Sequence, residues 1–376
     1  MKLWHKRGIV VAAIFAVNAT ACVPPTRLGP DRQEQSWISF LGAPGHDVSA
    51  AETLNPDPRP LWKTVAGRAV RGSAAIGESV IAVGSVDRNI VLLERATGQI
   101  FWRSHLPGTL HGGPLLDADR LYAATEATPE GKVVALRLRD GRIMWSRHSG
   151  SVVAPLAFDG AELFAGTEAG LVLRLNPDDG AVVWRRQLSG AVRAAPVVTP
   201  DGLVIATTND TLYLLDRATG AITATRATPG TVLSGPAYGQ HRVYAATTAG
   251  HILAIVLPAL TVAWDHPAGD GVLGAPALVH DTVYALTRGG VLWMIAAAGP
   301  AGAASRALGI VTRAGPTPTA SGVLVASVSG EVLLVDRADG RVLWRAQLDG
   351  PVEEAPIVKD RTLVVIGGRG DIHTYR

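Results

Sequence analysis

The chain has 376 residues, more than one hydrophobic core usually holds, so its length predicts several domains or one domain of repeated units. Glycine (42) and proline (24) are frequent while 47% of the residues are hydrophobic, which excludes a disordered chain and favours many short strands over long helices. The formal charge of +3 comes from Lys2, Lys6 and Arg7, so the rest of the chain is neutral and a nucleic-acid partner is disfavoured.

Residues 1–22 have the features of a secretion signal: a basic start, an apolar run over 9–17 and small residues before Cys22. The apolar run is far shorter than the roughly 20 residues of a membrane-spanning helix. Cys22 is the single cysteine, which excludes an intrachain disulfide and a thiolate metal cluster. The end of the signal is similar to a bacterial lipobox, which implies lipid attachment at Cys22. Ordinary cleavage after Ala21, giving a soluble periplasmic protein, is the alternative.

We favour the lipoprotein because acyl chains on Cys22 supply an anchor that the short apolar run cannot. Val23, rather than an aspartate, follows the cysteine. The resemblance to bacterial lipoproteins then implies that the protein is located at the periplasmic face of the outer membrane. Residues 23–60 contain seven prolines and no sustained periodicity, so they should form a linker of roughly 30 to 37 Å. An apolar cluster at 37–41 docks on the body or on a partner, or else lies in a loosely ordered segment.

The body, residues 61–376, repeats one unit at intervals of 40 or 41 residues. Each unit has a small residue, then proline, then an apolar strand; these pairs are Gly113–Pro114, Ala154–Pro155, Ala195–Pro196, Gly235–Pro236, Ala275–Pro276, Gly315–Pro316 and Ala355–Pro356. Ser73–Ile76 begins one further unit, in which alanine replaces the proline. Tryptophan is a second marker, at positions 62, 102, 145, 184, 264 and 344. This period predicts a propeller or a solenoid.

Within the third unit, alternation and turn residues predict four antiparallel strands, at 154–158, 162–167, 171–176 and 181–188. A glycine that permits positive φ recurs in the last turn, whereas the fifth and sixth units lose this motif and should have irregular outer turns. The chain enters with a segment that matches a fourth strand (61–67) and leaves after a third strand (371–376). The sequence therefore predicts an all-β, eight-bladed β-propeller of four-stranded antiparallel blades, its last blade closed by the N-terminal strand. The tryptophans should pack between neighbouring blades.

The repeat resembles the pyrroloquinoline quinone (PQQ)-type propeller repeat, as in LLERATGQIFW (92–102) and LLVDRADGRVLW (333–344). Eight such blades behind a lipoprotein-like signal resemble the BamB family, which implies a non-catalytic scaffold that binds BamA and assists assembly of outer-membrane β-barrel proteins. The family's Leu-x-Leu-Arg segment corresponds here to residues that end in Arg193, with Val192 in place of the second leucine. Its pair of aspartates is absent from the fifth unit, where residues 231–236 read TVLSGP.

Three residues before the proline column, the units present side chains that should surround one opening of the central channel. These positions are Arg71, His111, Val152, Arg193, Leu233, Leu273, Arg313 and Glu353, with Glu354 beside the last. The ring either only hydrates the opening or is a docking surface, since loops on a rigid scaffold carry function and arginine is favoured in interfaces. The cations facing Glu353 and Glu354 suggest a protein partner that is anionic on one side.

The sequence contains no motif that is typical of the enzyme classes considered. Quinoprotein dehydrogenases share the architecture, but resemblance to them would require adjacent cysteines and carboxylate or amide ligands for calcium, and Cys22 stands alone. Neither a zinc-protease H-E-x-x-H nor a G-x-S-x-G elbow is present. We therefore expect no cofactor, no metal and no catalysis. Three hypotheses remain open: a BamB-like scaffold that is a monomeric subunit of a complex, an exported binding or sensor propeller of another envelope system, and a PQQ-dependent dehydrogenase.

Overall fold

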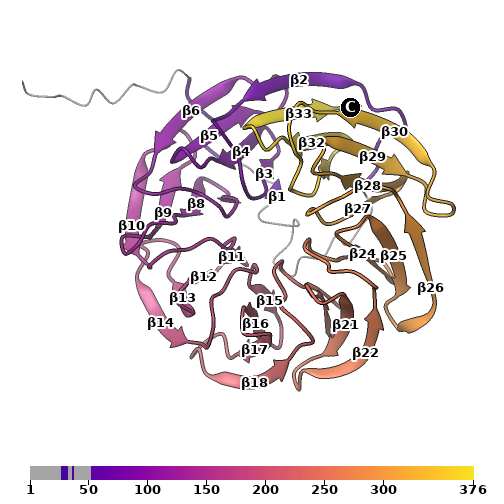
Figure 1. Ribbon diagram of the computed structural model, residues 1–376. Coiled ribbons are helices and arrows are strands. Elements are labelled where there is room, and N and C mark those ends of the chain that lie inside the picture. Colours follow the sequence, from indigo (N-terminus) through magenta and orange to yellow (C-terminus); the bar gives the residue numbers. More distant parts are fainter. Residues whose placement is uncertain (1–26, 33–35, 38–51) are drawn as a thin grey trace, which may run out of the picture.

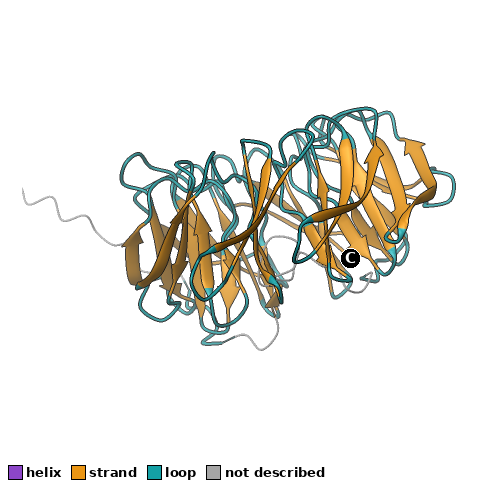
Figure 2. Cartoon of the chain, turned by 90° about the horizontal axis from the view of Figure 1, so that it is seen from below, coloured by secondary structure: helices purple, strands orange, loops and turns teal. Residues whose placement is uncertain are grey.

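The computed structural model describes residues 27–32, 36–37 and 52–376. Eight antiparallel sheets stand around a central axis (Figure 1), and each contains four strands of the propeller. Figure 2 shows the ring from its edge, with strands running between two faces that carry the loops. In the described ranges, no helix is long and apolar enough to cross a membrane. The prediction of an all-β, eight-bladed propeller is confirmed.

We number the blades along the chain and give their strands from the channel outward. Blade 1 contains β3 (Ala75–Gly77), β4 (Val80–Gly84), β5 (Asn89–Glu94) and β6 (Ile100–His105), and blade 2 contains β7 (Leu115–Asp117), β8 (Arg120–Ala124), β9 (Lys132–Arg137) and β10 (Ile143–His148). Blade 3 contains β11 (Ala157–Phe158), β12 (Leu163–Gly166), β13 (Leu171–Leu175) and β14 (Val182–Gln187), and blade 4 contains β15 (Val197–Thr199), β16 (Gly202–Thr207), β17 (Thr211–Leu215) and β18 (Ile222–Ala227).

Blade 5 contains β19 (Ala237–Gly239), β20 (Arg242–Ala246), β21 (His251–Val256) and β22 (Thr261–Pro267), and blade 6 contains β23 (Ala277–Val279), β24 (Thr282–Leu286), β25 (Val291–Ala296) and β26 (Gly299–Ala307). Blade 7 contains β27 (Thr317–Thr319), β28 (Gly322–Ala326), β29 (Glu331–Val335) and β30 (Val342–Gln347), and blade 8 contains β31 (Ile357–Lys359), β32 (Thr362–Ile366), β33 (Asp371–Tyr375) and β2 (Pro60–Val65). We call the segment that leads into each innermost strand an approach segment, and the turn between third and fourth strands an outer turn.

The last blade joins the two ends of the propeller. β2 pairs antiparallel with β33, with Trp62 opposite Thr374 and Val65 opposite Asp371. Just before this ladder, Arg59 and Arg376 exchange two backbone hydrogen bonds, of 2.8 and 2.9 Å. The predicted closure by an N-terminal outer strand is therefore confirmed, and the two sheet edges that would otherwise be exposed cover each other.

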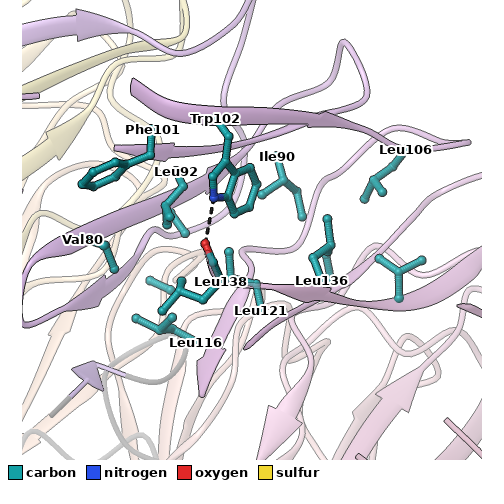
Figure 3. Close-up of a cluster of buried hydrophobic side chains, with 14 of the residues drawn as sticks. Val80, Ile90, Leu92, Phe101, Trp102, Leu106, Leu116, Leu121, Leu136 and Leu138 are labelled. Atoms are coloured by element: carbon teal, nitrogen blue, oxygen red, sulfur yellow. Dashed lines mark hydrogen bonds between the residues drawn. The ribbon is translucent and has the colours of Figure 1, made fainter. Parts of the chain in front are cut away.

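Apolar side chains on facing sheets form the core between neighbouring blades. The cluster between blades 1 and 2 contains Trp102 from β6, which is 1% exposed (Figure 3). The indole nitrogen of Trp102 donates 2.8 Å to the carbonyl of Leu138, across the blade boundary. Equivalent bonds between neighbouring blades run from Trp62 to Arg95, from Trp145 to Pro177, from Trp184 to Arg217 and from Trp264 to Ala297, at 2.8 to 3.1 Å. The predicted position of the tryptophans between blades is confirmed.

The outer-turn glycines are required for two reasons. Gly180 has a φ of +70°, a conformation that L side chains rarely adopt. A Cβ on Gly180 would also lie 2.5 Å from the ring of Trp145, on the preceding blade. The hairpin explains the positive φ, and the neighbouring tryptophan explains why the turn has no room for a methyl group.

We expect Gly180→Ala to destabilise the propeller by about 2 to 5 kcal/mol, because left-handed strain adds to overpacking against Trp145. Gly309→Ala is the matched control: Gly309 has a φ of +67°, and a Cβ there meets nothing within 4 Å. Only strain of about 1 to 2 kcal/mol applies to the control. Urea unfolding of both variants measures the difference, and equal losses would contradict the role of the tryptophan contact.

The outer turns of blades 5 and 6 depart from the common pattern, as predicted. In blade 5, Leu260 has a φ of +52° at the position where other blades have glycine. In blade 6, Ala296 pairs with Gly299, so the ladder continues further into the turn and β26 is nine residues long. Local pairing thus compensates for the missing turn motif.

The described parts of residues 23–60 lie against the propeller. β1 (Ser36–Trp37) pairs with the innermost strand of blade 1, with Trp37 opposite Ile76. Leu54 is buried in the core between blades 7 and 8, and its carbonyl accepts a bond from Ser321. Residues 36 and 37 therefore dock on the propeller, which is one of the alternatives given for the apolar cluster at 37–41. The remainder of that cluster and Cys22 lie outside the described residues.

Candidate functional site

The approach segments of all eight blades meet at one end of the channel and enclose a cavity of about 170 Å³. Six of the eight ring positions line this cavity: His111, Arg193, Leu233, Leu273, Arg313 and Glu353, with Glu354 beside them. We call these seven residues the mouth ring. Val152 is instead fully buried, and Arg71 is exposed while its neighbour Gly72 lines the cavity.

One backbone hydrogen bond holds each approach segment in place. In every blade a residue within two positions after the second strand donates its N–H to an approach-segment carbonyl, at 2.7 to 3.0 Å. The eight pairs are Val86 and Ala69, Glu126 and Thr109, Glu168 and Ser151, Thr208 and Ala191, Thr248 and Thr231, Arg288 and Gly271, Val328 and Val311, and Gly368 and Pro351. The mouth ring therefore stands on a rigid base.

Arg193 reaches across a blade boundary to Glu168. Its Nε lies 3.0 Å from Oε1 and its Nη2 lies 2.8 Å from Oε2, so the contact is bidentate. These hydrogen bonds raise the pKa of Arg193 above its ordinary value. The arginine side chain is 53% exposed, so its free edge remains available to a partner. Val192, by contrast, is fully buried in the core between blades 3 and 4, so it cannot replace a contacting leucine.

Other ring residues are also paired. The Nε2 of His111 lies 2.8 Å from the carboxylate of Glu126, in the same blade. Arg313 of blade 7 lies 3.5 Å from Glu353 of blade 8. The mouth is accordingly less cationic than its own residues suggest, because Glu168 offsets Arg193 and Glu126 adds a carboxylate beside His111.

Sequence reasoning missed these two acids because they come from the turn after the second strand rather than from the approach segment. A sequence signal for that turn exists. A small hydroxyl residue, buried in the structure, precedes it in seven units: Ser85, Thr125, Thr167, Thr207, Thr247, Thr287 and Ser327. Aligning this column places Glu126 and Glu168 at equivalent positions beside the mouth.

Glu354 connects the last blade to the first. Its Oε1 accepts the backbone N–H of Gly72 at 3.0 Å. Burial raises the pKa of the Glu354 carboxyl; Glu353 acts in the same direction, while the Gly72 N–H and Arg71 oppose the rise. The charged form of Glu354 is therefore less favourable in the folded protein than in the unfolded chain.

Glu354→Gln should consequently stabilise the protein at neutral pH. A carboxyl whose folded pKa is raised binds its proton more tightly in the folded state, so its stabilising contribution is present at low pH and lost as the pH rises through that pKa. Glutamine stays neutral and still accepts from Gly72. We expect the variant to melt a few degrees above wild type at pH 7.5 and together with it near pH 4. A constant difference across this range would contradict the assignment.

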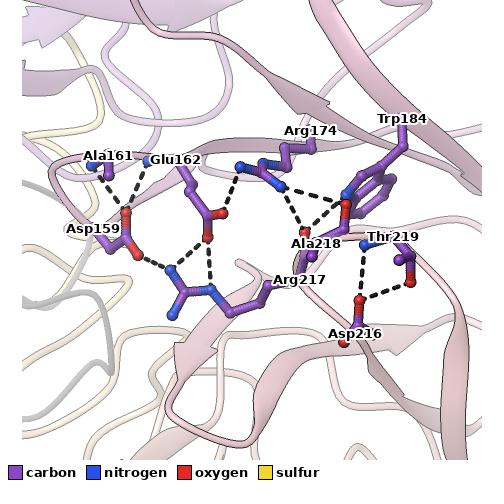
Figure 4. Close-up of polar contacts among 9 residues, drawn as sticks. All are labelled: Asp159, Ala161, Glu162, Arg174, Trp184, Asp216, Arg217, Ala218 and Thr219. Carbon is purple, nitrogen blue, oxygen red and sulfur yellow. Dashed lines mark hydrogen bonds and ion pairs between the residues drawn. The ribbon is translucent and has the colours of Figure 1, made fainter.

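A second polar cluster connects blades 3 and 4 on the face opposite to the mouth ring. Figure 4 shows the side chains of this cluster. The guanidinium of Arg217 binds both Asp159 and Glu162, and Arg174 lies 2.7 Å from the other oxygen of Glu162. Arg174 also donates to the carbonyl of Arg217 at 3.2 Å. Two acids and two arginines thus neutralise each other and join the blades, which favours a structural role for this cluster.

The mouth does not match a calcium-bound quinone site. Of the carboxylates at the mouth, Glu353 and Glu354 already bind Arg313 and the Gly72 N–H. Glu126 and Glu168 are paired with His111 and Arg193. Within residues 27–32, 36–37 and 52–376, no group of three or more His, Cys, Asp or Glu side chains could hold a metal ion. The residues present therefore do not fit the cofactor of a quinoprotein dehydrogenase.

Comparison with known proteins assigns the repeat. A family model described as outer membrane protein assembly factor BamB matches residues 47–189, 129–223, 168–300 and 279–375. The chain belongs to the BamB family. It spans about half the length of the curated relatives it matches. BamB of Shewanella oneidensis is 25% identical over 200 residues, 50% of each chain, and BamB of Yersinia pestis is 27% identical over 218 residues, 50% of this chain and 53% of that one.

Solved structures share the fold. BamB from Moraxella catarrhalis has a TM-score of 0.71 and 16% identity, covering 85% of this chain and 99% of that one. A quinohemoprotein alcohol dehydrogenase from Comamonas testosteroni has a TM-score of 0.75 and 12% identity, covering 92% and 81% of the two chains. Since a BamB and a dehydrogenase superpose about equally well, the fold alone does not distinguish scaffold from enzyme.

Proposed function

We propose that this protein is a non-catalytic, protein-binding scaffold that assists the assembly of outer-membrane β-barrel proteins. The match of the BamB family model, which extends over nearly the whole propeller, carries this proposal. The relatives in the comparison are named as outer membrane protein assembly factors. The lack of fit to a quinone site supports a binding role over the dehydrogenase chemistry of the other structural neighbours.

The mouth ring is the proposed docking surface for a protein partner of the BamA-like barrel type. Arg193 supports this assignment, because it is held by Glu168 on a rigid scaffold while about half of its side chain faces solvent. Arg313 and His111 are placed in the same way by their own acids. Pre-ordered arginines lose little entropy when they form charge-assisted hydrogen bonds with a partner. Arg71, Glu353 and Glu354 complete the candidate surface.

The proposed location is the periplasmic face of the outer membrane, with lipid attached at Cys22. The short apolar run of the signal and the position of the single cysteine after Ala21 support it. A soluble periplasmic protein is the alternative. In the proposed complex, the chain is one monomeric subunit.

One observation favours a second candidate function, a binding propeller of another envelope system. The fifth blade presents Leu233 and Ser234 to the cavity, where the resemblance to BamB would place acidic residues. The partner surface therefore differs from the family pattern in chemistry, and a different partner is the direct consequence to test.

Affinity purification from crosslinked native membranes tests both candidates. Recovery of a BamA-like barrel protein supports the first, and its absence alongside another envelope partner supports the second. Arg193→Gln should reduce recovery several-fold while changing stability by less than about 0.5 kcal/mol, because the contact with Glu168 is at the surface. Glutamine is the suitable replacement, since Arg193→Glu would place two carboxylates together and perturb the scaffold.

Arg313→Gln and Arg71→Gln separate a local site from a general cationic surface. A docking site limited to blade 4 predicts a smaller effect for both, and a shared surface predicts similar effects. Arg341→Gln is the matched control, because Arg341 is an exposed, ion-paired arginine next to the outer turn of blade 7, on the opposite face. Loss of recovery in the control as well would contradict a specific mouth-ring contact.

A further inference from the structure

The first described residues bind the rim where blades 1 and 2 meet. The backbone N–H of Arg27 donates 3.0 Å to the carbonyl of Phe101, on the outer strand β6. The N–H of Gly29 donates 2.8 Å to the carbonyl of Arg139, in the outer turn of blade 2. These two bonds attach the chain to adjacent blades at residues 27 and 29.

Side chains reinforce this attachment. The guanidinium of Arg27 lies 5.0 Å from the ring centroid of Phe101, so it covers the aromatic face. The same group donates to both carboxylate oxygens of Glu94, at 3.1 and 3.2 Å, and to Gln99 at 3.1 Å. Arg27 therefore binds the outer turn of blade 1 through three acceptor atoms and a ring face.

This attachment shortens the free tether. If lipid is attached at Cys22, only residues 23–26 separate the anchor from Arg27. Five residue steps span at most about 18 Å when fully extended. That reach is about half of the roughly 30 to 37 Å expected for a linker that is free along its whole length. An anchored protein with Arg27 bound must hold the rim of blades 1 and 2 near the bilayer.

The surface beside the attachment has the chemistry of a bilayer contact. Leu28, Ile143 and Met144 expose apolar side chains beside the outer turn of blade 2. Arg139 and Arg142 flank them; their side chains are 51% and 80% exposed and are paired with Asp31 at 3.2 Å and Asp140 at 3.5 Å. Apolar side chains and arginines suit the headgroup boundary of a membrane that contains anionic lipids.

The outer turns lie at the opposite end of the strands from the mouth ring. In each blade the chain leaves the approach segment at the mouth and runs along four antiparallel strands, so the turn after the third strand is at the far face. A strand of about five residues is about 17 Å long, which separates the two faces. A bilayer contact at the outer turns would therefore leave the mouth ring unobstructed.

We infer that the outer-turn face of blades 1 and 2 rests against the bilayer that holds the lipidated N-terminus, with the mouth ring facing away from it. This inference rests on the proposed lipid attachment at Cys22. The occupant of the surface is the lipid bilayer, and the bound segment at Arg27 sets the orientation. Without that segment the first described attachment would be β1 at Ser36, and the longer tether would no longer hold the rim of blades 1 and 2 near the bilayer.

Fluorescence quenching on vesicles tests the orientation. The full-length lipoprotein is reconstituted into phosphatidylethanolamine and phosphatidylglycerol vesicles that contain nitroxide-labelled headgroups. A single fluorophore is placed through Ile143→Cys on blade 2 or, as the matched control, through Val262→Cys on blade 5. Both sites lie two residues before a tryptophan on an outer strand, and they are 47% and 43% exposed. We expect quenching at least two-fold stronger at position 143.

A third protein, with Arg27→Ala added to Ile143→Cys, tests the cause. Loss of the bonds to Glu94 and Gln99 should free the tether and reduce quenching at position 143 toward that at position 262. Equal quenching at the two sites in the parent chain would overturn the inference, as would strong quenching at 143 that persists without Arg27.

Free thiols counted before labelling separate this inference from the proposed function. Acylation blocks Cys22, so a single free thiol shows that lipid is attached, and equal quenching in that protein overturns the orientation alone. Two free thiols would overturn the lipid attachment itself, and with it the inference. Fractionation of Cys22→Ala, which should move the protein from membrane to soluble fraction with an unchanged melting temperature, provides the independent check.

Discussion

A chain that begins at Arg68 is expected to lose most of its stability, because it lacks β2 and leaves the last blade with three strands. The deletion removes the ladder to β33, the fully buried Ala66 and the indole bond from Trp62 to Arg95. It also exposes β33 as an unprotected edge. The loss should be about 5 kcal/mol or more, comparable with the total stability of many domains.

Two longer chains provide the comparison. A chain that begins at Glu52 retains the described contacts of residues 52–59. A chain that begins at Pro60 retains β2 but loses Leu54, which is 1% exposed, at a cost of about 2 to 3 kcal/mol. Melting temperatures should therefore fall from the Glu52 chain to the Pro60 chain and much further to the Arg68 chain. Equal values for the last two would contradict closure of the ring by β2.

Trp102→Ala is expected to cost about 3 to 5 kcal/mol, the largest effect of a single substitution proposed for this protein. The side chain is almost fully buried between blades 1 and 2, so its removal leaves a cavity in the core. It also leaves the buried carbonyl of Leu138 without the indole donor. Urea unfolding of the wild type and the variant measures this loss.

Two related variants separate the contributions. Trp102→Phe retains most of the aromatic volume and removes the hydrogen bond, so it should cost less than Trp102→Ala. Trp184→Ala should also cost less, because Trp184 is half-buried although it makes the same kind of bond, to Arg217. A smaller loss for Trp102→Ala than for Trp184→Ala would show that burial between blades does not determine the stability of the ring.

The repeat made the fold predictable. Every blade packs against the next, so the same positions must be small, apolar or aromatic in each unit, and this shared requirement is visible as a period of 40 or 41 residues. The unmatched strand at each end then identified the closing blade. The strand ends were less predictable: the innermost strand of blade 3 is Ala157–Phe158 rather than 154–158, because the proline at 155 lies in the approach segment.

The candidate site was only partly predictable. The positions three residues before each proline correctly predicted six side chains around the cavity. A position in the repeat does not give the direction of its side chain, so Val152 was expected at the mouth but lies in the core. The pairing of Arg193 with Glu168 depends on two different columns from adjacent blades. Such contacts follow from the rotation between blades, which a repeat alignment does not contain.

The closing contact also fixes an order of events during synthesis. The bond between Thr374 and the carbonyl of Trp62 joins residues that are 312 positions apart. Among the strands of the ring, β2 is made first and its partner β33 last, so the first seven sheets can complete their own hairpins while the edges of β2 and β33 are still unpaired. Strand edges that have not yet found their partner can pair wrongly and cause aggregation. The ring can therefore close only after β33 has left the ribosome, and a chain that stops just before β33 should stay open however well its other blades have formed.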